Sequence, residues 1–540
     1  MVLNKSFLVI NNVKLSVNAS QTEAFSVARK VLKKIGLSSY ATGFSVFKRS
    51  IDARKKPIIY FVYSIAVSGD FPDVPSDVLS KNGITIHKTE FLSSPEIGNI
   101  SLLSRPIVVG SGPCGLFAAL VLAENGYRPI ILERGGSMEE RQKAAEVFNK
   151  KQILDADTNI QFGASGAGTF SDGKLVTRIN DPLTNYVIEK FIEHGAPGDI
   201  RYIAKPHVGT DILSNVVSKM IDSIIEKGGE ILYHTKFLYP IARDGRVTSV
   251  MTSIGEIPCG ALVIATGHSA RDTYTELLSR NFNIEAKPFS VGMRIEHLSE
   301  DIDRALYGDA AGSPGLGRGE YALSHNTKQR GTYTFCMCPG GIVVAAASED
   351  GGVVVNGMSY HSRSGVNSNS AVVTSIFKED YGGTPTKAIE FQREIERRAF
   401  LAGGKDYSAP IITLGDFLSG ELKRAPKRIV PSYMNGINVK LARPESYLPN
   451  YVCDGIKSAI LDFDRKISGF ASQDAVLTGA ETRTSAPVRI IRDSETRLAT
   501  GFKNIFPSGE GAGYAGGITS AAVDGVRSAY ALMKIFKPNN

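Results

Sequence analysis

The stretch Pro106–Gly136, "PIVVGSGPCGLFAALVLAENGYRPIILERGG", decides the fold. Its first 18 residues, Pro106–Ala123, carry no charge, and an apolar run of that length can span a membrane. Three glycines and a proline between positions 110 and 115 interrupt the run, and a spanning helix would not tolerate them. We expect instead a buried strand, a tight glycine turn, a helix and a second strand, Pro129–Leu132.

Each glycine of the turn "GSGPCG" has a separate role in a dinucleotide fold. Gly110 permits the tight turn, Gly112 lets a pyrophosphate approach the backbone, and Gly115 lets helix and strand pack closely. The phosphates would lie at the helix N-terminus, where unpaired N–H groups favour negative charge. Glu133 closes the second strand, where an acid can accept hydrogen bonds from an adenosine ribose. The glycine pattern alone is weak evidence, but strand, helix, strand and acid in this order predict a dinucleotide site.

Length and composition indicate a soluble enzyme of several domains. A chain of 540 residues is too long for one ordinary core, and 42% hydrophobic with 21% charged residues fits an α/β protein rather than a disordered one. The N-terminus lacks a signal-peptide pattern, so we expect a cytoplasmic protein. The cysteines are too few and too scattered for a disulfide scaffold or a paired zinc site, and no metal is expected: Cys114, Cys259, Cys336, Cys338 and Cys453.

Basic charge is concentrated at the start of the chain. Residues 1–100 carry +6 of the formal net charge of +8, most densely in "FKRSIDARKK" (Phe47–Lys56). Such a patch can bind a nucleic acid or another polyanion. No aromatic-rich binding signature accompanies the charge, so we favour the solvated basic face of a small domain. Nucleic acid is therefore not the favoured partner.

The rest of the chain divides into recognisable segments. The first hundred residues read as a compact α+β unit, with a capping box of Ser20 and Glu23 ahead of a helix. The pattern from Tyr186 to Lys227 predicts mainly helix, and "EILYHTKF" (230–237) predicts a strand. Residues 288–479 mix strands with a polar helix and are expected to form a separate domain.

Three further segments resemble the glutathione-reductase-type FAD enzymes. They are the loop "FGASGAGTFSDGKL" (162–175), the strand end "VIATG" (263–267) and the terminal "NIFPSGEGAGYAGG" (504–517). The resemblance implies that Gly267 approaches the adenine side, that Glu510 takes the ribitol-binding place, and that the helix near Gly517 points at the flavin pyrimidine. The FAD-binding residues it implies, together with the glycine turn, are Gly110, Gly112, Pro113, Cys114, Gly115, Glu133, Arg134, Gly168, Thr169, Lys174, Thr266, Gly267, Gly509, Glu510, Gly517 and Ile518.

A second GxGxxG pattern occurs near the C-terminus. Gly511, Gly513 and Gly516 satisfy it, yet only 24 residues follow, too few for another strand–helix–strand unit and its acid. We therefore expect no separate NAD-binding domain. If NAD(P)H is the reductant, it must dock transiently on the flavin face.

Over its whole length the chain resembles the bacterial FAD-dependent dehydrogenases, whose substrate is unassigned. The strings that carry this closer likeness are "RSIDARKK", "GAGTFSDGKL", "KPHVGTD", "ATGHSARDT", "TFCMCPGG", "NGMSYHSR" and "ETRTSAPVR". They imply kinship and FAD binding but assign no catalytic residue.

Cys336 and Cys338 in "TFCMCPGG" are the first candidates for the reacting site. Two residues apart on a strand, their thiols would face the same side, and a dithiol beside the flavin would imply disulfide chemistry. A disulfide at this spacing closes a small, strained ring, so we favour two small buried hydrophobes.

Three histidines and three arginines are the other candidates. His207, His268 and His297 could exchange the proton that accompanies hydride transfer, although each taken singly is more often structural. Arg294, Arg363 and Arg483 could clamp a carboxylate or phosphate, or could equally pair with nearby acids such as Glu296 and Glu481.

We expect an α/β protein with a Rossmann-like, glutathione-reductase-type FAD-binding domain at 101–287 and 480–540. A mixed α+β substrate or cap domain at 288–479 is inserted into it, and a basic α+β domain at 1–100 lies outside. The expected function is an FAD-dependent oxidoreductase (dehydrogenase) that transfers hydride through flavin N5 to or from a small-molecule substrate, for which an anion would suit the arginines. The alternatives are a flavoenzyme that acts on RNA and a non-catalytic FAD-containing binding protein. Substrate, electron partner and oligomeric state stay open.

Overall fold

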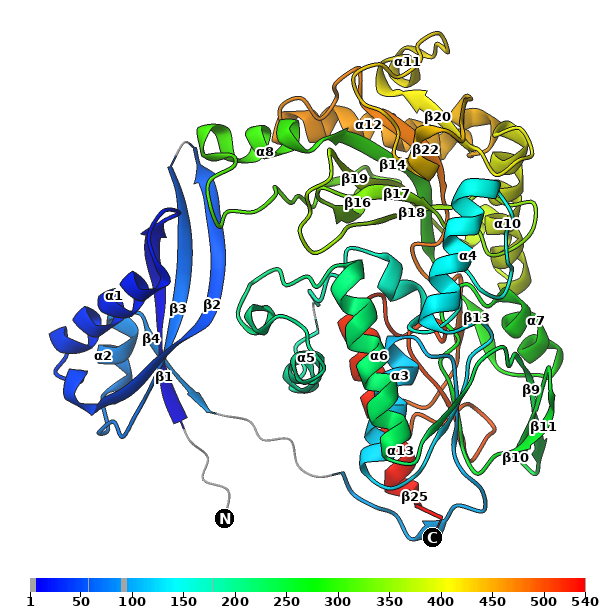
Figure 1. The fold of residues 1–540 in the computed structure, drawn as a ribbon, viewed down its shortest axis with the longest axis horizontal. Coiled ribbons are helices and arrows are strands. Elements are labelled where there is room, and N and C mark those ends of the chain that lie inside the picture. The colour runs from blue at the N-terminus through cyan, green and yellow to red at the C-terminus, as the bar shows by residue number, and fades with distance from the viewer. Residues whose placement is uncertain (1–5, 57, 89–94, 178, 540) are drawn as a thin grey trace.

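The computed structural model describes residues 6–56, 58–88, 95–177 and 179–539. Figure 1 shows three lobes: an N-terminal lobe in blue, a central lobe built around helices α3, α6 and α13, and a third lobe built around a large sheet. The third is called the C-terminal lobe because its strands follow most of the central lobe in sequence, although the C-terminus itself lies in the central lobe. Helices and strands are mixed throughout, which confirms the α/β class. The predicted 1–100 unit includes positions 1–5, 57 and 89–94, which lie outside the described residues.

The N-terminal lobe is a four-stranded sheet with two helices. The strand order is β2-β3-β1-β4, with every neighbouring pair antiparallel. The Ser20 and Glu23 capping box is present, as predicted, with the Glu23 carboxylate 2.9 Å from the Ser20 amide. The elements are β1 (Ser6–Ser16), α1 (Gln21–Lys34), β2 (Ala41–Lys55), β3 (Ile58–Gly69), α2 (Ser76–Lys81) and β4 (Ile84–Lys88).

The central lobe contains a five-stranded parallel sheet in the order β24-β12-β6-β7-β8. Its strands are β6 (Ile107–Val109), β7 (Ile130–Leu132), β8 (Glu230–Leu232), β12 (Leu262–Ile264) and β24 (Ile505–Pro507). Helix α3 (Pro113–Glu124) packs between α6 (Thr210–Glu226) and α13 (Ile518–Ile535), and its residues 114–123 are all buried. The fully apolar run of the opening stretch is thus explained by burial on every side of α3.

The expected long helix between 186 and 227 is interrupted. The chain forms α5 (Leu183–Glu193), a loop with a short 3₁₀ turn, and then α6. Pro197 and Pro206 lack the N–H that a helix needs, and Gly209 has φ +82°, outside the helical region. The predicted strand 230–237 is also shorter, because β8 ends at Leu232. The remaining elements here are α4 (Met138–Lys151), α7 (Arg271–Ser279) and the antiparallel strands β9 (Phe237–Arg243), β10 (Arg246–Thr252) and β11 (Gly255–Pro258).

The C-terminal lobe is a seven-stranded sheet in the order β15-β16-β19-β14-β22-β20-β21. Its long central strands, β14 (Phe289–Leu298) and β19 (Asn367–Ile376), are buried along nearly their whole length. The other strands are β15 (Ser324–Asn326), β16 (Gly331–Cys338), β20 (Ala409–Thr413), β21 (Val439–Leu441) and β22 (Val476–Glu481). The helices are α8 (Ser299–Tyr307), α9 (Lys378–Tyr381), α10 (Pro385–Ala402), α11 (Leu414–Ser419) and α12 (Asn450–Lys466).

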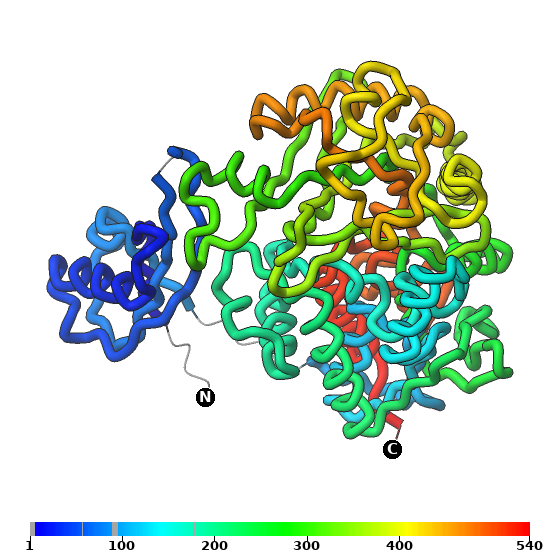
Figure 2. Tube along the Cα trace, turned by 45° about the horizontal axis from the view of Figure 1, so that its top comes forward, coloured from blue at the N-terminus to red at the C-terminus, as the bar shows by residue number. Residues whose placement is uncertain are grey.

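Three two-stranded pairs occur among the described residues besides the larger sheets. They are β17 (Ile342–Ala345) with β18 (Val355–Met358), β13 (Ile284–Ala286) with β23 (Val488–Ile490), and β5 (Ile100–Ser101) with β25 (Phe536–Lys537). In Figure 2 the N-terminal lobe meets the green segment that follows α8, where Ile59 packs with Tyr307 and Leu316. The edge of β2 also joins the central lobe, because the Arg49 amide donates to the Tyr202 carbonyl at 2.8 Å.

Candidate active site

One cavity of about 350 Å³ brings together most of the residues singled out in the sequence. It lies at the carboxyl ends of β6, β7 and β12, where open α/β sheets bind their ligands. Its far wall comes from β16, β18 and β22 of the C-terminal lobe. The predicted residues that line it are Gly110, Gly112, Pro113, Cys114, Glu133, Arg134, Gly168, Lys174, Thr266, Gly267, His268, Cys336, Glu510, Gly517 and Ile518.

The glycine turn forms one end of the cavity. Gly110 has φ +95°, and a Cβ there would lie 2.5 Å from the Ala265 carbonyl oxygen. A Cβ on Gly115 would lie 1.9 Å from the Gly110 oxygen, so this glycine serves packing, as predicted, and stands behind the wall. A Cβ on Gly112 would meet nothing nearer than 3.9 Å, which leaves the space in front of it open.

Glu133 organises this end of the cavity. Its carboxylate accepts hydrogen bonds from the Ser111 amide at 3.1 Å, the Ser111 hydroxyl at 2.6 Å, and the amides of Gly135 and Gly163 at 3.0 Å each. These four bonds occupy most of the acceptor positions of a carboxylate. Glu133 therefore fixes the glycine turn itself, and its expected contact with a ribose stays a prediction.

Two helices begin at the cavity without a side-chain cap. Gly112 is the N-cap of α3 and Gly517 the N-cap of α13, and neither receives a capping bond from a side chain. The first amides and the positive helix ends therefore face the cavity, where they favour negative charge. Beside them, the buried Thr266 hydroxyl has no hydrogen-bond partner within the described chain. Burial raises the pKa of Glu510 to about 7.

Charged side chains gather at the opposite end. The Lys174 ammonium lies 2.7 Å from the Asp172 carboxylate and donates to the Met337 carbonyl. Asp172 also binds Arg363, with 3.0 Å to its Nε. Across the cavity, burial raises the pKa of Glu481, and Arg294 bonds its carboxylate at 2.9 Å. This end can bind an anion and exchange protons.

Six predicted residues do not line this cavity. Gly115 and Gly509 lie behind the wall, and the Gly509 amide is bonded to Asp524 at 2.7 Å. Thr169 is buried and bonded to Ser165. The remaining three are Cys338, His207 and His297.

The histidines occupy three different environments. His207 stacks on His361 at 5.2 Å and bonds its carbonyl at 3.1 Å, outside the cavity lining. His297 is buried and bonded to the Phe470 carbonyl at 2.8 Å, which makes it part of the C-terminal core. Only His268 lines the cavity, and burial with two nearby guanidiniums lowers its pKa to about 3. It is therefore neutral at physiological pH.

The three arginines are engaged with acids, as one of the two interpretations predicted. Arg294 pairs with Glu481, Arg363 with Asp172 and Glu320, and Arg483 with Glu396 at 3.0 Å. Arg483 also lines the cavity. Sequence analysis names Glu481 only as a partner for an arginine and assigns no individual role to five other cavity residues: Gln161, Phe162, Asp172, Asn356 and Thr484. Which of these side chains meet here depends on contacts across long sequence separations.

Comparison with known proteins identifies the family. A model of an FAD binding domain matches residues 105–152, and one described as "FAD-dependent protein, C-terminal domain-like" matches residues 288–484. A domain of unknown function matches residues 8–68. An uncharacterized protein of Clostridium beijerinckii is 42% identical over 531 residues, which are 98% of each chain. The chain belongs to this family of FAD-dependent proteins. FAD is its cofactor.

The residues of the cavity fit this cofactor. The open space before Gly112 and the uncapped start of α3 suit a pyrophosphate. The unpartnered Thr266 hydroxyl and the Glu510 carboxylate offer polar contacts, and the start of α13 offers positive potential. These groups come from three separate segments of the chain: the glycine turn, the end of β12 and residues 510–518.

Several solved flavoenzyme structures share a loose likeness with the chain. Glycine oxidase from Bacillus cereus is 11% identical, with 80% of this chain and 98% of that chain covered and a TM-score of 0.35. L-Proline dehydrogenase from P. horikoshii is 12% identical, with 81% and 93% covered and a TM-score of 0.33. Nothing about the substrate of this chain is drawn from them.

Within the described ranges, none of the helices combines the length and the apolar character that crossing a bilayer requires. In the same part of the chain, no group of three or more His, Cys, Asp or Glu side chains is placed to hold a metal ion.

Proposed function

We propose that this chain is an FAD-dependent oxidoreductase with a glutathione-reductase-type FAD-binding part, and that a small-molecule substrate reacts at the charged end of the cavity. The observation that carries the proposal is the cavity itself, which joins two uncapped helix starts to a cluster of titratable side chains. When bound, FAD supplies hydride or electron transfer.

The chain's own residues would divide the binding of FAD between the two helix starts. The first amides of α3 would hold the pyrophosphate, with Gly112 leaving room for it. Glu510 and Thr266 would accept or donate hydrogen bonds to the polyol part. The first amides of α13 would favour negative charge at the flavin pyrimidine.

At the other end, Lys174 is the cation best placed to hold an anionic substrate group. It lines the cavity, and its pKa is raised: burial, the largest single influence, lowers it, but the combined attraction of Asp172, Cys338 and Glu320 outweighs burial. Two groups lining the cavity titrate near neutral pH: the pKa of Cys336 is lowered to about 6, and that of Glu510 is raised to about 7. Because Glu510 would bind the polyol part of FAD, Cys336 is the group that would take up or release the proton that accompanies hydride transfer.

No observation favours the RNA-acting alternative. Asp52 binds Arg54 at 2.8 Å and Lys14 at 3.2 Å, and Lys56 donates to the Ala305 carbonyl. Part of the basic charge is thus used within the protein. The alternative therefore stays a prediction to be tested.

The experiment is anaerobic reduction of the purified holoprotein with NADH, NADPH and small dithiols in turn, followed at the flavin absorbance. We expect a yellow protein that releases FAD on denaturation and is reduced by one of these donors. Release of FMN or of no flavin would contradict the proposal. A flavin that dithionite reduces but that no donor or substrate reduces or reoxidises would favour the non-catalytic binding protein.

A further inference from the structure

Strand β16 is distorted where it carries Cys336. Phe335 pairs with Ala371 of β19, and the next pairing joins Cys338 to Asn369, so β16 contains one extra residue at this point. Cys336 has φ +44°, in the left-handed region that non-glycine residues seldom adopt. Bulges of this kind re-aim side chains next to active sites. Here the half-buried Cys336 lines the cavity, while Cys338 is fully buried.

The bulge also changes the backbone geometry between the two cysteines. In a regular strand the Cα atoms of residues i and i+2 lie about 6.6 Å apart, near the upper limit for a disulfide. In this structure the Cys338 thiol donates to the Cys336 carbonyl oxygen at 3.3 Å, so the buried thiol is turned back toward Cys336. Both cysteines are free thiols. A disulfide between these cysteines still closes the small ring noted from the sequence, but the bulge, rather than a regular strand, sets their separation.

Two cations hold this bulge from opposite sides. Arg294 donates to the Cys336 carbonyl at 3.1 Å and lies 3.9 Å from the Cys338 sulfur. Lys174 donates to the Met337 carbonyl between the two cysteines. The hydrogen bond from Cys338, together with these two cations, lowers the pKa of Cys336 from 9.0 to about 6, whereas the pKa of Cys338 is raised. Cys336 is therefore the sulfur of the pair that ionises first.

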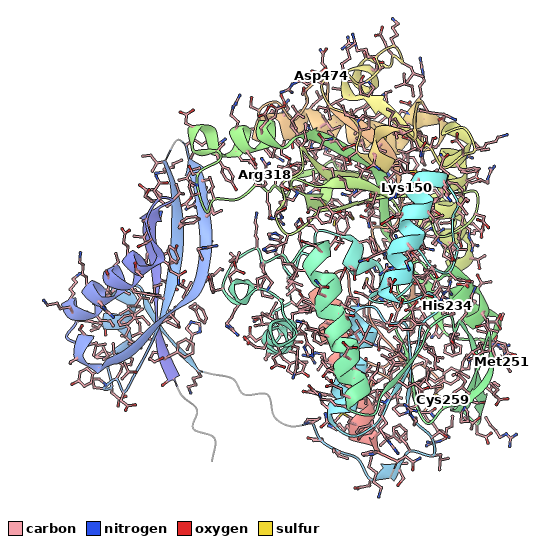
Figure 3. All side chains as sticks on the ribbon, in the orientation of Figure 1. Lys150, His234, Met251, Cys259, Arg318 and Asp474 are labelled. Atoms are coloured by element: carbon pink, nitrogen blue, oxygen red, sulfur yellow. The ribbon has the colours of Figure 1, made fainter. Side chains whose placement is uncertain are left out.

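The other cysteines lack this environment. Cys114 lines the same cavity, but burial raises its pKa. Cys259 lies beside the β9–β11 sheet, as Figure 3 shows, and Cys453 lies in α12; burial raises the pKa of each to about 12. Thiolate chemistry in this chain is therefore confined to the bulge of β16.

We propose that Cys336 and Cys338 form a dithiol–disulfide couple that exchanges two electrons with bound FAD, an inference that rests on the proposed function. On oxidation, the Cys336 thiolate and the Cys338 sulfur form an S–S bond, and the S–H bond of Cys338 breaks. Two electrons and the Cys338 proton pass to FAD, so charge and atoms balance. The reverse transfer reopens the disulfide. Cys336 is the sulfur that a small dithiol or disulfide substrate reaches, because Cys338 is 0% exposed.

Anaerobic dithionite titration of the holoprotein tests the electron count. Flavin and disulfide each take two electrons, so an oxidised wild-type protein should take up four per FAD. Cys336→Ser and Cys338→Ser should each take up two, and the matched control Cys453→Ala should still take up four. Two-electron uptake by the wild type would overturn the inference.

Thiol trapping gives a readout that does not depend on turnover. Trypsin releases Gly331–Arg363, which contains both cysteines and no other. After aerobic oxidation and alkylation in denaturant, this peptide should carry a disulfide in the holoprotein and two alkyl groups in FAD-free protein treated identically. Two alkylated cysteines in the holoprotein would overturn the inference even if the serine variants failed to fold. A protein that holds no reducible FAD would instead contradict the proposed function.

Discussion

The two ends of the cavity use different means to hold their ligands. The glycine end relies on backbone: Gly110 and Gly112 turn the chain, and α3 starts there with no side-chain cap. The charged end relies on side chains from two distant segments. One segment carries the Asp172–Lys174 pair, and the other is the bulge of β16 at Cys336. Backbone sites depend on which residues are small enough, whereas side-chain sites depend on which charges stand nearby. Substitutions should therefore act by shape at one end and by charge at the other.

The largest effect is expected for Gly112→Val. Gly112 has φ −68° and ψ 179°, which valine adopts readily, and a Cβ there has 3.9 Å of clearance, so the variant should fold. Its side chain would occupy the space for the pyrophosphate and weaken FAD binding by about 100-fold, or about 2.8 kcal/mol. Flavin content and FAD titration of the apoprotein measure this.

The matched control for this prediction is Gly198→Val. A Cβ on Gly198 meets no atom within 4 Å, and the residue lies outside the cavity lining. It should keep its flavin and its melting temperature. A Gly112→Val protein that retained a full complement of FAD would show that the glycine end does not depend on the small size of this residue.

At the charged end, Lys174→Met should raise the pKa of Cys336. Removing a nearby cation raises the pKa of a thiol by about one unit or more, so alkylation at pH 6, where about half of the wild-type thiol is ionised, should slow by at least about fivefold. In the wild type the rate of Cys336 modification by iodoacetamide should rise through a midpoint near pH 6. Peptide mass spectrometry follows the site directly. Lys205→Met, at an exposed lysine, is the control, and an equal slowing in both variants would refute the assigned role of Lys174.

A smaller effect is expected for Glu510. Its pKa of about 7 means that it is protonated below neutral pH and ionised above. If a hydroxyl of FAD donates to the ionised carboxylate, affinity falls as the pH drops through 7, by at most about tenfold per unit. Glu510→Gln should abolish this pH dependence while retaining moderate affinity. Calorimetric titrations with FAD at pH 6 and 8 measure this pH dependence. If the FAD affinity of Glu510→Gln changed with pH as much as that of the wild type, Glu510 would be excluded as the titrating group.

The smallest effect is expected from the basic N-terminal lobe. Phosphates should bind at the backbone end of the cavity rather than at the surface lysines and arginines. We expect no retention of mixed tRNA by the full chain at physiological ionic strength. Filter binding titrated from low to physiological salt measures this. Micromolar binding at physiological salt, falling steeply as salt is added, would favour the RNA-acting alternative.

The sequence predicts well what depends on local geometry. Gly110 and Gly115 are recognisable because their turn admits no side chain, and the Ser20 capping box follows from four consecutive residues. It does not predict the bulge at Cys336, which arises from pairing with β19 more than 30 residues later. The sequence offers His297 as a candidate for proton transfer. Its place in the C-terminal core depends on a contact with Phe470, which the local sequence does not predict.

Helix α13 also determines when the FAD site can form during synthesis. It packs against α3, and β24 pairs with β12, so the site needs both the beginning and the end of the central lobe. At ribosomal speeds of about 5–20 residues per second, the roughly 400 residues between the two helices take about 20–80 s to make. Throughout that interval the buried, uncharged residues 114–123 of α3 lack their final cover. The nascent chain must therefore be kept from aggregating until α13 is complete, and the cofactor can be captured only after α13 has been made.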